Sequence, residues 1–366
     1  MEQQGLQVSR AEAGQKLLNF LQRRIDAPTG DFHRWIRTGQ VRVNGARAKA
    51  FDRIEEGDLV RVPPFAVFLP AGNAGRADKS ALSGRTPSTP KRSEGRSGDK
   101  FGSDGRPDAA RTDSPDPRQS SSLRIVHEDE DILVIAKPAG LPVQGGTGHS
   151  DSIAARLAQE RADADFVPAP VHRLDKDTTG LLIAGKTYAA VRLLTDALAG
   201  RGGQAPRKEY LAWVEGRWPF SPEDGPQELH DVLAKDKKAQ RMRTRDDDEG
   251  QEARCIVTTL ETRRHPEGPK GREYSLLLVR LLTGRTHQIR VQLASRGHAI
   301  VGDPWYGNSE RKISNRKPER DIRQEKPAEG LKLHAFRLTV PLPGKTEPLS
   351  LDLLPPWKGA WKVSKV

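Results

Sequence analysis

The sequence predicts an α+β protein with two folded parts, a small helix–helix–hairpin unit and a larger body on a mixed, mainly antiparallel β-sheet with flanking helices. Three observations carry this prediction. Apolar residues recur at helical spacing near the N-terminus, strand-like apolar runs separated by turn residues dominate the second half, and a polar stretch divides the two. The expected boundaries are 10–67 for the unit, 68–122 for a disordered linker and 123–358 for the body.

The first part reads as two helices followed by a hairpin. Apolar side chains repeat every three or four residues in two groups, which are Leu17, Leu18, Leu21, Ile25 and then Phe32, Trp35, Ile36. Gly39 ends the second helix, and Asn44-Gly45 is a strong hairpin-turn pair. Basic residues crowd the junction between helix and hairpin, namely Arg34, Arg37, Arg42, Arg47 and Lys49. Such a cluster is either a nucleic-acid contact surface or simply a solvated basic face.

The dividing stretch is expected to be a flexible linker. Between residues 71 and 122 only Leu82 and Phe101 are large and apolar, so the segment buries too little surface to offset its ordering entropy. As a random coil it would reach about 40 Å. We therefore expect the N-terminal part to be tethered to the body and not packed on it.

From Leu123 onward the chain alternates apolar runs with turn signals, without a regular βαβ order. Residues 187–199 have the pattern of an amphipathic helix, and 308–330 form a polar stretch that we expect to be an exposed insertion. The predicted strands are Ile132–Ile135, Leu181–Ala184, Tyr210–Val214, Ile256–Leu260, Tyr274–Leu282 and Leu338–Val340.

Composition narrows the classes of function. The chain has 61 Lys and Arg residues against 49 Asp and Glu, a net charge of +12, which favours polyanionic partners such as nucleic acid. The single cysteine, Cys255, excludes an intrachain disulfide and lies in an apolar run expected in the core. The nine histidines lack ligand spacing, which argues against a metal site. No segment approaches the roughly 20 apolar residues of a membrane span, so a cytoplasmic protein is expected.

One motif is misleading. Residues Gly180 to Thr187 match the phosphate-binding P-loop letter for letter. A phosphate cradle needs an exposed backbone that turns its N–H groups inward, whereas the four intervening residues are Leu181, Leu182, Ile183 and Ala184. These residues favour a buried strand, so we expect no nucleotide site here.

Two charged segments are better candidates for chemistry. His172-Arg173-Leu174-Asp175-Lys176-Asp177 is a polar turn before a buried strand, where cationic neighbours favour an ionised Asp175. Gly284-Arg285-Thr286-His287 precedes an alternation of Ile289, Val291 and Leu293, which predicts a strand with Arg290 on its polar face. Each segment alone also fits an ordinary surface turn or an edge strand.

The two charged segments belong to a larger set of motifs that occur in a fixed order along the chain. The ordered blocks are Lys137-Pro138-Ala139-Gly140, His172 to Leu182, Lys208-Glu209-Tyr210, Gly284 to Val291, Gly302 to Gly307 and Leu333-His334-Ala335. They resemble the RluA-type pseudouridine synthases over residues 123–356. The order helix, helix, Val41-Arg-Val-Asn-Gly45, then Gly57-Asp58 resembles the S4 RNA-binding domain.

The resemblance implies that the chain isomerises uridine in RNA to pseudouridine, a reaction that breaks the C1′–N1 bond, forms a C1′–C5 bond and needs no cofactor or nucleotide. It implies Asp175 as the catalytic carboxylate, Arg290 as its ion-pair partner and Tyr210 as the ring that stacks on the uracil. Arg173 would help to hold the flipped nucleotide. The remaining implied RNA contacts are His172, Lys208 and Arg285, with the five N-terminal cations named above.

His172 is typical of the RluA-type branch, and an N-terminal S4 domain is typical of its members that modify ribosomal RNA. The resemblance therefore implies an enzyme acting on 23S rRNA, and we expect it to be a monomer. Two alternatives remain open, a tRNA pseudouridine synthase and an inactive RNA-binding assembly factor. The chain departs from the family in its long linker, in insertions at 202–206 and 308–330, and in Gln292 where His is usual.

Overall fold

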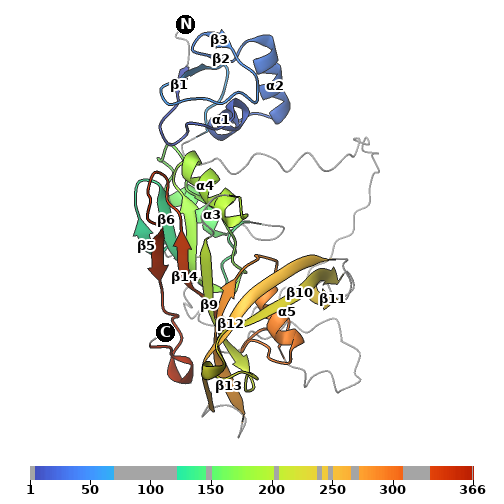
Figure 1. The fold of residues 1–366 in the computed structure, drawn as a ribbon. Coiled ribbons are helices and arrows are strands. Elements are labelled where there is room, and N and C mark those ends of the chain that lie inside the picture. The colour runs from blue at the N-terminus through green and yellow to red at the C-terminus, as the bar shows by residue number, and fades with distance from the viewer. Residues whose placement is uncertain are drawn as a thin grey trace, which may run out of the picture.

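The computed structural model describes residues 5–69, 122–145, 151–201, 206–236, 241–245, 250–264, 272–307, 330–364 and 366. The predicted linker and the two predicted insertions lie wholly or almost wholly outside these ranges. Figure 1 shows a small N-terminal unit at one end of the molecule and a long, twisted sheet below it, with helices packed against the sheet.

The N-terminal unit pairs two helices with a small sheet of order β1-β4-β2-β3. Gly39 takes a left-handed φ of 75° where the second helix ends, and Asn44 and Gly45 have φ of 50° and 78° in the hairpin turn, as the sequence predicts. The elements are β1 (Gly5–Gln7), α1 (Leu17–Arg24), α2 (Thr29–Thr38), β2 (Arg42–Val43), β3 (Ala46–Arg47) and β4 (Leu59–Arg61). Because β1 pairs with β4, the unit begins before the expected residue 10.

The body holds one mixed, mainly antiparallel sheet, as predicted. Its described elements are β5 (Ile125–Glu128), β6 (Ile132–Lys137), α3 (Ile153–Glu160), β7 (Ala169–Pro170), β8 (Thr179–Gly185), α4 (Tyr188–Leu198), β9 (Arg207–Glu215), β10 (Gln227–Asp236), β11 (Arg241–Arg245), β12 (Gln251–Arg264), β13 (Glu273–Leu281), α5 (Gln288–Ser295), β14 (Leu333–Val340) and β15 (Leu349–Asp352), with short 3-10 turns at Pro222–Asp224 and Gly359–Trp361. None of the helices within the described ranges is long and apolar enough to cross a membrane. Cys255 is 1% exposed in the main core, as expected.

Strand β14 lies at the centre of the sheet. The strand order is β11-β10-β12-β13-β9-β14-β8-β6-β5, with β15 paired to β14 and β7 paired to β8. Only the β14–β8 pair is parallel; the other described pairs are antiparallel. Strand β14 therefore joins two parts of the sheet, β5–β8 and β9–β13, each of which is continuous in sequence.

The P-loop-like segment is a buried strand, as its apolar residues predict. All seven residues of β8 are buried. Gly180, with φ of 113°, lies so close to β14 that a Cβ there would collide with the main chain of Ala335. This glycine therefore serves close strand packing, and the buried backbone of β8 offers no phosphate cradle.

One predicted element is wrong. The alternation at Ile289, Val291 and Leu293 predicts a strand, but these residues belong to helix α5, of which Gln288 to Leu293 are buried. Arg290 therefore does not share an exposed polar face with Gln288 and Gln292. The Gln292 amide donates to Asp231 Oδ2 at 2.7 Å and to the Ala253 carbonyl at 3.1 Å, so its polarity is satisfied inside the protein.

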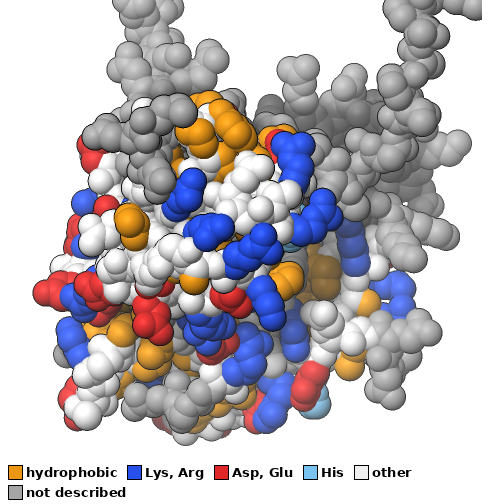
Figure 2. All heavy atoms as spheres, turned by 90° about the horizontal axis from the view of Figure 1, so that it is seen from above, with side chains coloured by type: hydrophobic (Ala, Val, Ile, Leu, Met, Phe, Trp, Pro, Cys, Tyr) orange, Lys and Arg blue, Asp and Glu red, His pale blue; other side chains and the backbone are white. Residues whose placement is uncertain are grey.

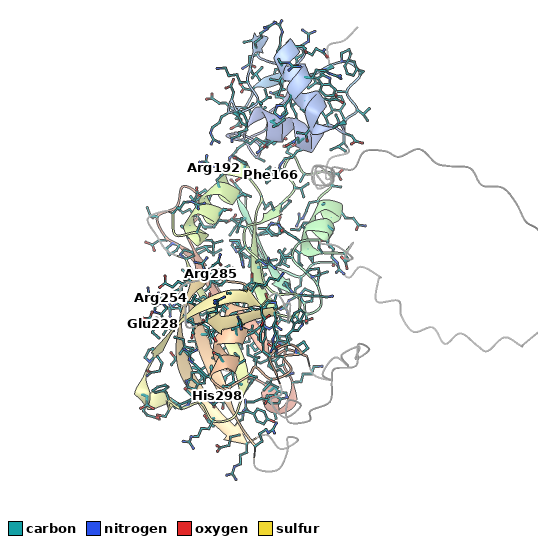
Figure 3. The ribbon with its side chains drawn as sticks, turned by 90° about the vertical axis from the view of Figure 1, so that its right-hand side faces the viewer. Phe166, Arg192, Glu228, Arg254, Arg285 and His298 are labelled. Carbon is teal, nitrogen blue, oxygen red and sulfur yellow. The ribbon has the colours of Figure 1, made fainter. Side chains whose placement is uncertain are left out.

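The N-terminal unit also packs on the body, contrary to the expectation of a purely tethered unit. The Arg23 guanidinium lies 4.3 Å from the centroid of the Phe166 ring, and the Tyr188 N–H donates to the Ala11 carbonyl at 2.9 Å. Arg10 and Glu130 form an exposed ion pair at 3.0 Å. Figure 3 shows Phe166 and Arg192 on the end of the body that faces the unit. Phe166 is 3% exposed, and an apolar ring of this size drives such packing whatever the linker length.

Candidate active site

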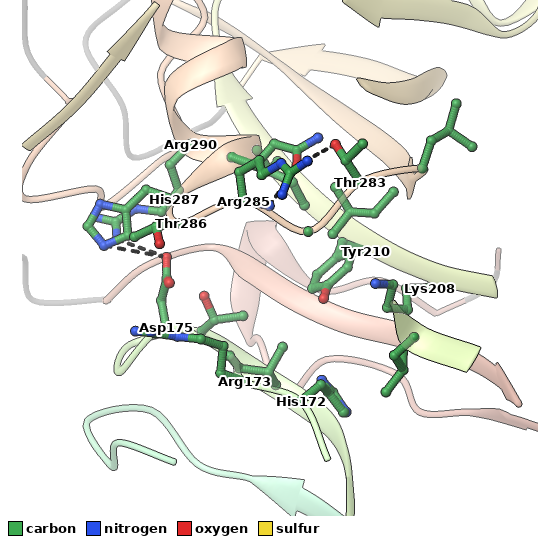
Figure 4. Close-up of a pocket in the computed structure, with 18 of the residues that line it drawn as sticks. His172, Arg173, Asp175, Lys208, Tyr210, Thr283, Arg285, Thr286, His287 and Arg290 are labelled. Atoms are coloured by element: carbon green, nitrogen blue, oxygen red, sulfur yellow. Dashed lines mark hydrogen bonds and ion pairs between the residues drawn. The ribbon is translucent and has the colours of Figure 1, made fainter. Parts of the chain in front are cut away.

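A cavity of about 530 Å³ opens where the loop before β8 meets the N-terminal end of α5. Its walls include seven of the residues singled out above, which are His172, Arg173, Asp175, Lys208, Tyr210, Arg285 and Arg290. Figure 4 shows Asp175 pointing from one side toward His287 and Arg290, with Tyr210 and Lys208 on strand β9. Residues from three distant segments thus meet in one place.

The loop that carries Asp175 is held from beneath by a buried lysine. Lys137 is 2% exposed, and its Nζ donates to the carbonyl oxygens of Pro138 and Lys176 at 2.9 and 2.8 Å. The Gly140 N–H donates to the same Lys176 carbonyl at 2.9 Å. Burial lowers the pKa of Lys137 to about 8, although Asp177 and Asp175 act in the opposite direction. The Lys-Pro-x-Gly block therefore supports the Asp175 loop directly.

Arg290 binds two carboxylates at once. Its Nε and Nη2 donate to Asp303 Oδ2 and Oδ1 at 2.7 and 2.8 Å, while Nη1 donates to Asp175 Oδ2 at 3.1 Å. The side chains of Arg290 and Asp303 are 6% and 0% exposed. Burial alone would lower the pKa of Arg290, but hydrogen bonds to Asp303 and the charges of both carboxylates raise it. Arg290 is a permanent cation that orients one oxygen of Asp175.

Tyr210 lines the cavity from strand β9 and is 7% exposed. Burial, and after it the negative charge of Asp175, raises the pKa of Tyr210. The phenol is therefore neutral at physiological pH and presents an uncharged ring and hydroxyl to the cavity. A neutral aromatic ring with a polar tip is suited to stacking on a planar base.

The other predicted RNA contacts fall into two groups. Arg173 and Arg285 are exposed at the cavity, where the Arg285 Nε donates to the Glu252 carbonyl at 2.9 Å. His172 and Lys208 are half-buried. The His172 Nε2 accepts the Ile183 N–H at 3.1 Å, and burial lowers the pKa of His172 to about 4, so this ring is neutral and braces β8. Burial also lowers the pKa of Lys208.

The five N-terminal cations lie on the unit at the other end of the molecule (Figure 1). Arg37, Arg47 and Lys49 line a second groove with His33 and Ile36. Arg34 instead pairs with Asp31 at 3.0 Å, and Arg42 donates to the carbonyls of Gly39 and Gly45, where it supports the hairpin. The structure thus brings three of the five to one groove, separate from the cavity.

Sequence reasoning missed three residues of the cavity region. Asp303 lies in a noted block, but nothing in the sequence indicates that it binds Arg290. His287 and Tyr306 form a hydrogen-bonded pair beside Asp175. The only available signal was their position in two of the blocks, because a contact between residues 19 positions apart, on either side of helix α5, cannot be predicted from spacing. Within the described residues, no group of three or more His, Cys, Asp or Glu side chains could hold a metal ion.

Comparison with known proteins agrees with this geometry. The RNA pseudouridylate synthase family model matches residues 131–295. The ribosomal large subunit pseudouridine synthase C of Salmonella typhimurium (strain LT2) is 31% identical over 350 residues, 93% of this chain and 89% of that protein. Its counterpart in Escherichia coli (strain K12) is 32% identical over 305 residues, covering 82% of this chain and 78% of that protein.

Among solved structures, human RNA pseudouridylate synthase domain containing 1 shares the fold, with a TM-score of 0.50 and 24% identity over 64% of this chain and 84% of that one. The family match covers the Asp175 loop, Tyr210 and Arg290, and the curated relatives extend the similarity over most of the chain. This chain belongs to the RNA pseudouridylate synthase family.

Proposed function

We propose that this protein isomerises specific uridines to pseudouridine in large-subunit (23S) ribosomal RNA, with Asp175 as the catalytic carboxylate. The observation that carries the proposal is the position of Asp175 at the cavity, with Oδ2 held by Arg290 at 3.1 Å. The names of the two bacterial relatives support ribosomal RNA of the large subunit as the substrate.

Each lining residue has a role in this proposal. The target uridine leaves its helix, at a cost of a few kcal/mol, and enters the cavity, where Tyr210 stacks on the uracil. Arg173 and Arg285, exposed at the cavity, contact the flanking phosphates, and Lys208 contributes positive potential from below. Asp175 acts on the ribose or the base while Arg290 stabilises its charge. His172 acts through β8, since its Nε2 is occupied by a main-chain N–H.

The N-terminal unit is proposed to be an S4-type RNA-binding domain. Its groove of Arg37, Arg47 and Lys49 presents three cations without a carboxylate among its lining residues. Figure 2, which looks down on this end of the molecule, shows Lys and Arg side chains gathered across the face. Backbone phosphates are the natural ligands of such a surface, so this unit would add affinity without reading the modified base.

The test is a map of pseudouridines in RNA from cells with and without the gene, complemented by wild type or Asp175→Asn. Loss of one or more sites in 23S rRNA, restored by wild type and not by Asp175→Asn, is the expected result. Loss of sites in tRNA alone would show that the substrate is tRNA and not 23S rRNA. Rescue of every site by Asp175→Asn would show that Asp175 is not the catalytic group.

A further inference from the structure

His287 lies beside Asp175 and has an unusual backbone. Its φ is 53°, and among the described non-glycine residues only Asn44, in a hairpin turn, shares a positive φ. His287 immediately precedes α5 and gives that helix no side-chain cap, so capping does not explain the conformation. Backbone strain of this kind persists where surrounding contacts impose it, and such strain clusters at functional sites.

The contacts of the imidazole favour one tautomer. The Met242 N–H of strand β11 donates to the Tyr306 hydroxyl oxygen at 3.1 Å. Because this oxygen already accepts one hydrogen bond, the Tyr306 hydroxyl hydrogen is available to be donated to His287 Nδ1, which is 2.9 Å away. A ring that accepts at Nδ1 carries its hydrogen on Nε2, and Nε2 lies 3.9 Å from Asp175 Oδ2.

The ring is also neutral in this environment. Burial lowers the pKa of His287, and although the charge of Asp175 acts in the opposite direction, Arg290 adds to the lowering. The rings of Trp305 and Tyr306 pack edge-on against the imidazole at centroid distances of 5.7 Å each. A neutral imidazole packed between these rings can accept a hydrogen bond from Tyr306 at Nδ1 and direct its Nε2–H toward Asp175 at the same time.

We propose that His287 is a positioning residue that holds Oδ2 of Asp175 through Nε2–H, with its tautomer set by Tyr306. Together with Arg290 Nη1, it fixes that oxygen and leaves Oδ1 directed to the substrate. The present separation of 3.9 Å is longer than a hydrogen bond and shortens when a flipped uridine fills the cavity. The inference rests on the proposed catalytic role of Asp175.

Two substitutions at one position separate this role from a purely structural one. In His287→Gln the amide nitrogen occupies the place of Nε2, whereas in His287→Asn it occupies the place of Nδ1. Asn tolerates the positive φ better than Gln. A backbone role therefore favours Asn, and a hydrogen bond to Asp175 favours Gln. Single-turnover rates on a 23S rRNA fragment should fall by less than about tenfold for Gln and by about 100-fold or more for Asn, with unchanged RNA affinity. Equal rates, or a faster Asn variant, would overturn the proposal.

Tyr306→Phe provides a second test, which concerns the tautomer of His287. The variant keeps a ring 5.2 Å from the Arg290 guanidinium carbon and removes only the hydroxyl. It should slow the wild-type enzyme about tenfold and add nothing in the His287→Gln background, where no tautomer needs fixing. Equal losses in both backgrounds would contradict the tautomer argument. Asp175→Asn is run in parallel: an active Asp175→Asn variant overturns the catalytic assignment and this inference together, whereas an inactive one with a fast His287→Asn overturns this inference alone.

Discussion

Arg290→Lys tests the buried ion network most directly. The guanidinium makes three charge-assisted hydrogen bonds, at 2.7 and 2.8 Å to Asp303 and at 3.1 Å to Asp175. A single ammonium cannot reproduce a fork that faces two carboxylates, so we expect two of the three bonds to be lost. At about 1.5–3 kcal/mol for each such bond, the free energy of unfolding should fall by about 3 kcal/mol or more. The lysine ammonium still attracts both carboxylates, so we expect a loss of unfolding free energy at the lower end of this range, about 3 kcal/mol.

The assay is urea unfolding followed by tryptophan fluorescence, since Trp213 and Trp361 are buried and in contact in the body. For a chain of this size the urea slope is about 3 kcal/mol/M, so the midpoint should fall by about 1 M. The matched control is Arg254→Lys. Arg254 binds Glu228 at 2.7 Å, and Figure 3 labels both residues. The two side chains are 43% and 45% exposed, so the midpoint should not move.

Equal midpoints for Arg290→Lys and Arg254→Lys would refute the reasoning, because the buried network would then contribute no more than an exposed pair. Activity is measured separately, without urea, where both variants are folded. Arg290→Lys should lose most of its turnover number because Arg290 contacts Asp175, while RNA affinity should stay near wild type because the Arg290 side chain is only 6% exposed.

Four further predictions follow from the structure. Asp175→Asn should abolish pseudouridine formation and leave RNA affinity nearly intact, which rate and binding measurements on one RNA will show. Lys186→Ala should leave activity unchanged and reveal no ATP binding by calorimetry, because Lys186 pairs with Glu128 at 2.9 Å behind a buried strand. Phe166→Ala should weaken binding to long rRNA more than to a short stem-loop, because it frees the N-terminal unit; equal weakening would contradict the docking. The pKa of Lys137 falls from 10.5 to about 8 on folding, so the unfolded chain binds more protons between these values, and wild type should gain stability over Lys137→Met as pH rises from about 8 to 10.5.

Much of the fold could be predicted from the sequence because buried strands appear in it as runs of apolar residues. The run Leu181–Ala184 predicts a strand against a competing nucleotide motif, and β8 is that strand. The apolar pattern gives the wrong prediction at α5, where it indicates a strand. Ile289 and Leu293 are also spaced four apart, and a helix buried on every side has no polar face for a periodicity to reveal.

The contacts between side chains in the candidate site could not be predicted from the residues alone. The charge and position of Asp175 make it a candidate, but its pairing with Arg290, 115 residues away, came only from family resemblance. The Asp303 and His287 contacts depend on side-chain directions that no spacing encodes. The docking of the N-terminal unit was missed for a related reason: one of its contacts is the carbonyl of Ala11, a main-chain group that every residue carries.

The central position of β14 has a consequence for the order of events during synthesis. Asp175 precedes β8 in the first part of the sheet, while Arg290 lies on α5 behind the second part, and β14 hydrogen-bonds to both β8 and β9. A chain that lacks residues 333–340 therefore lacks the strand between β8 and β9, and each part of the sheet then has an unpaired edge at the place where β14 belongs.

Among the described strand pairs, the two parts of the sheet are joined through residues 333–340, so we expect the Asp175–Arg290 contact to form late. We therefore expect the nascent chain to be inactive until β14 emerges. Its two open edges are also the surfaces that chaperones would have to protect in that interval.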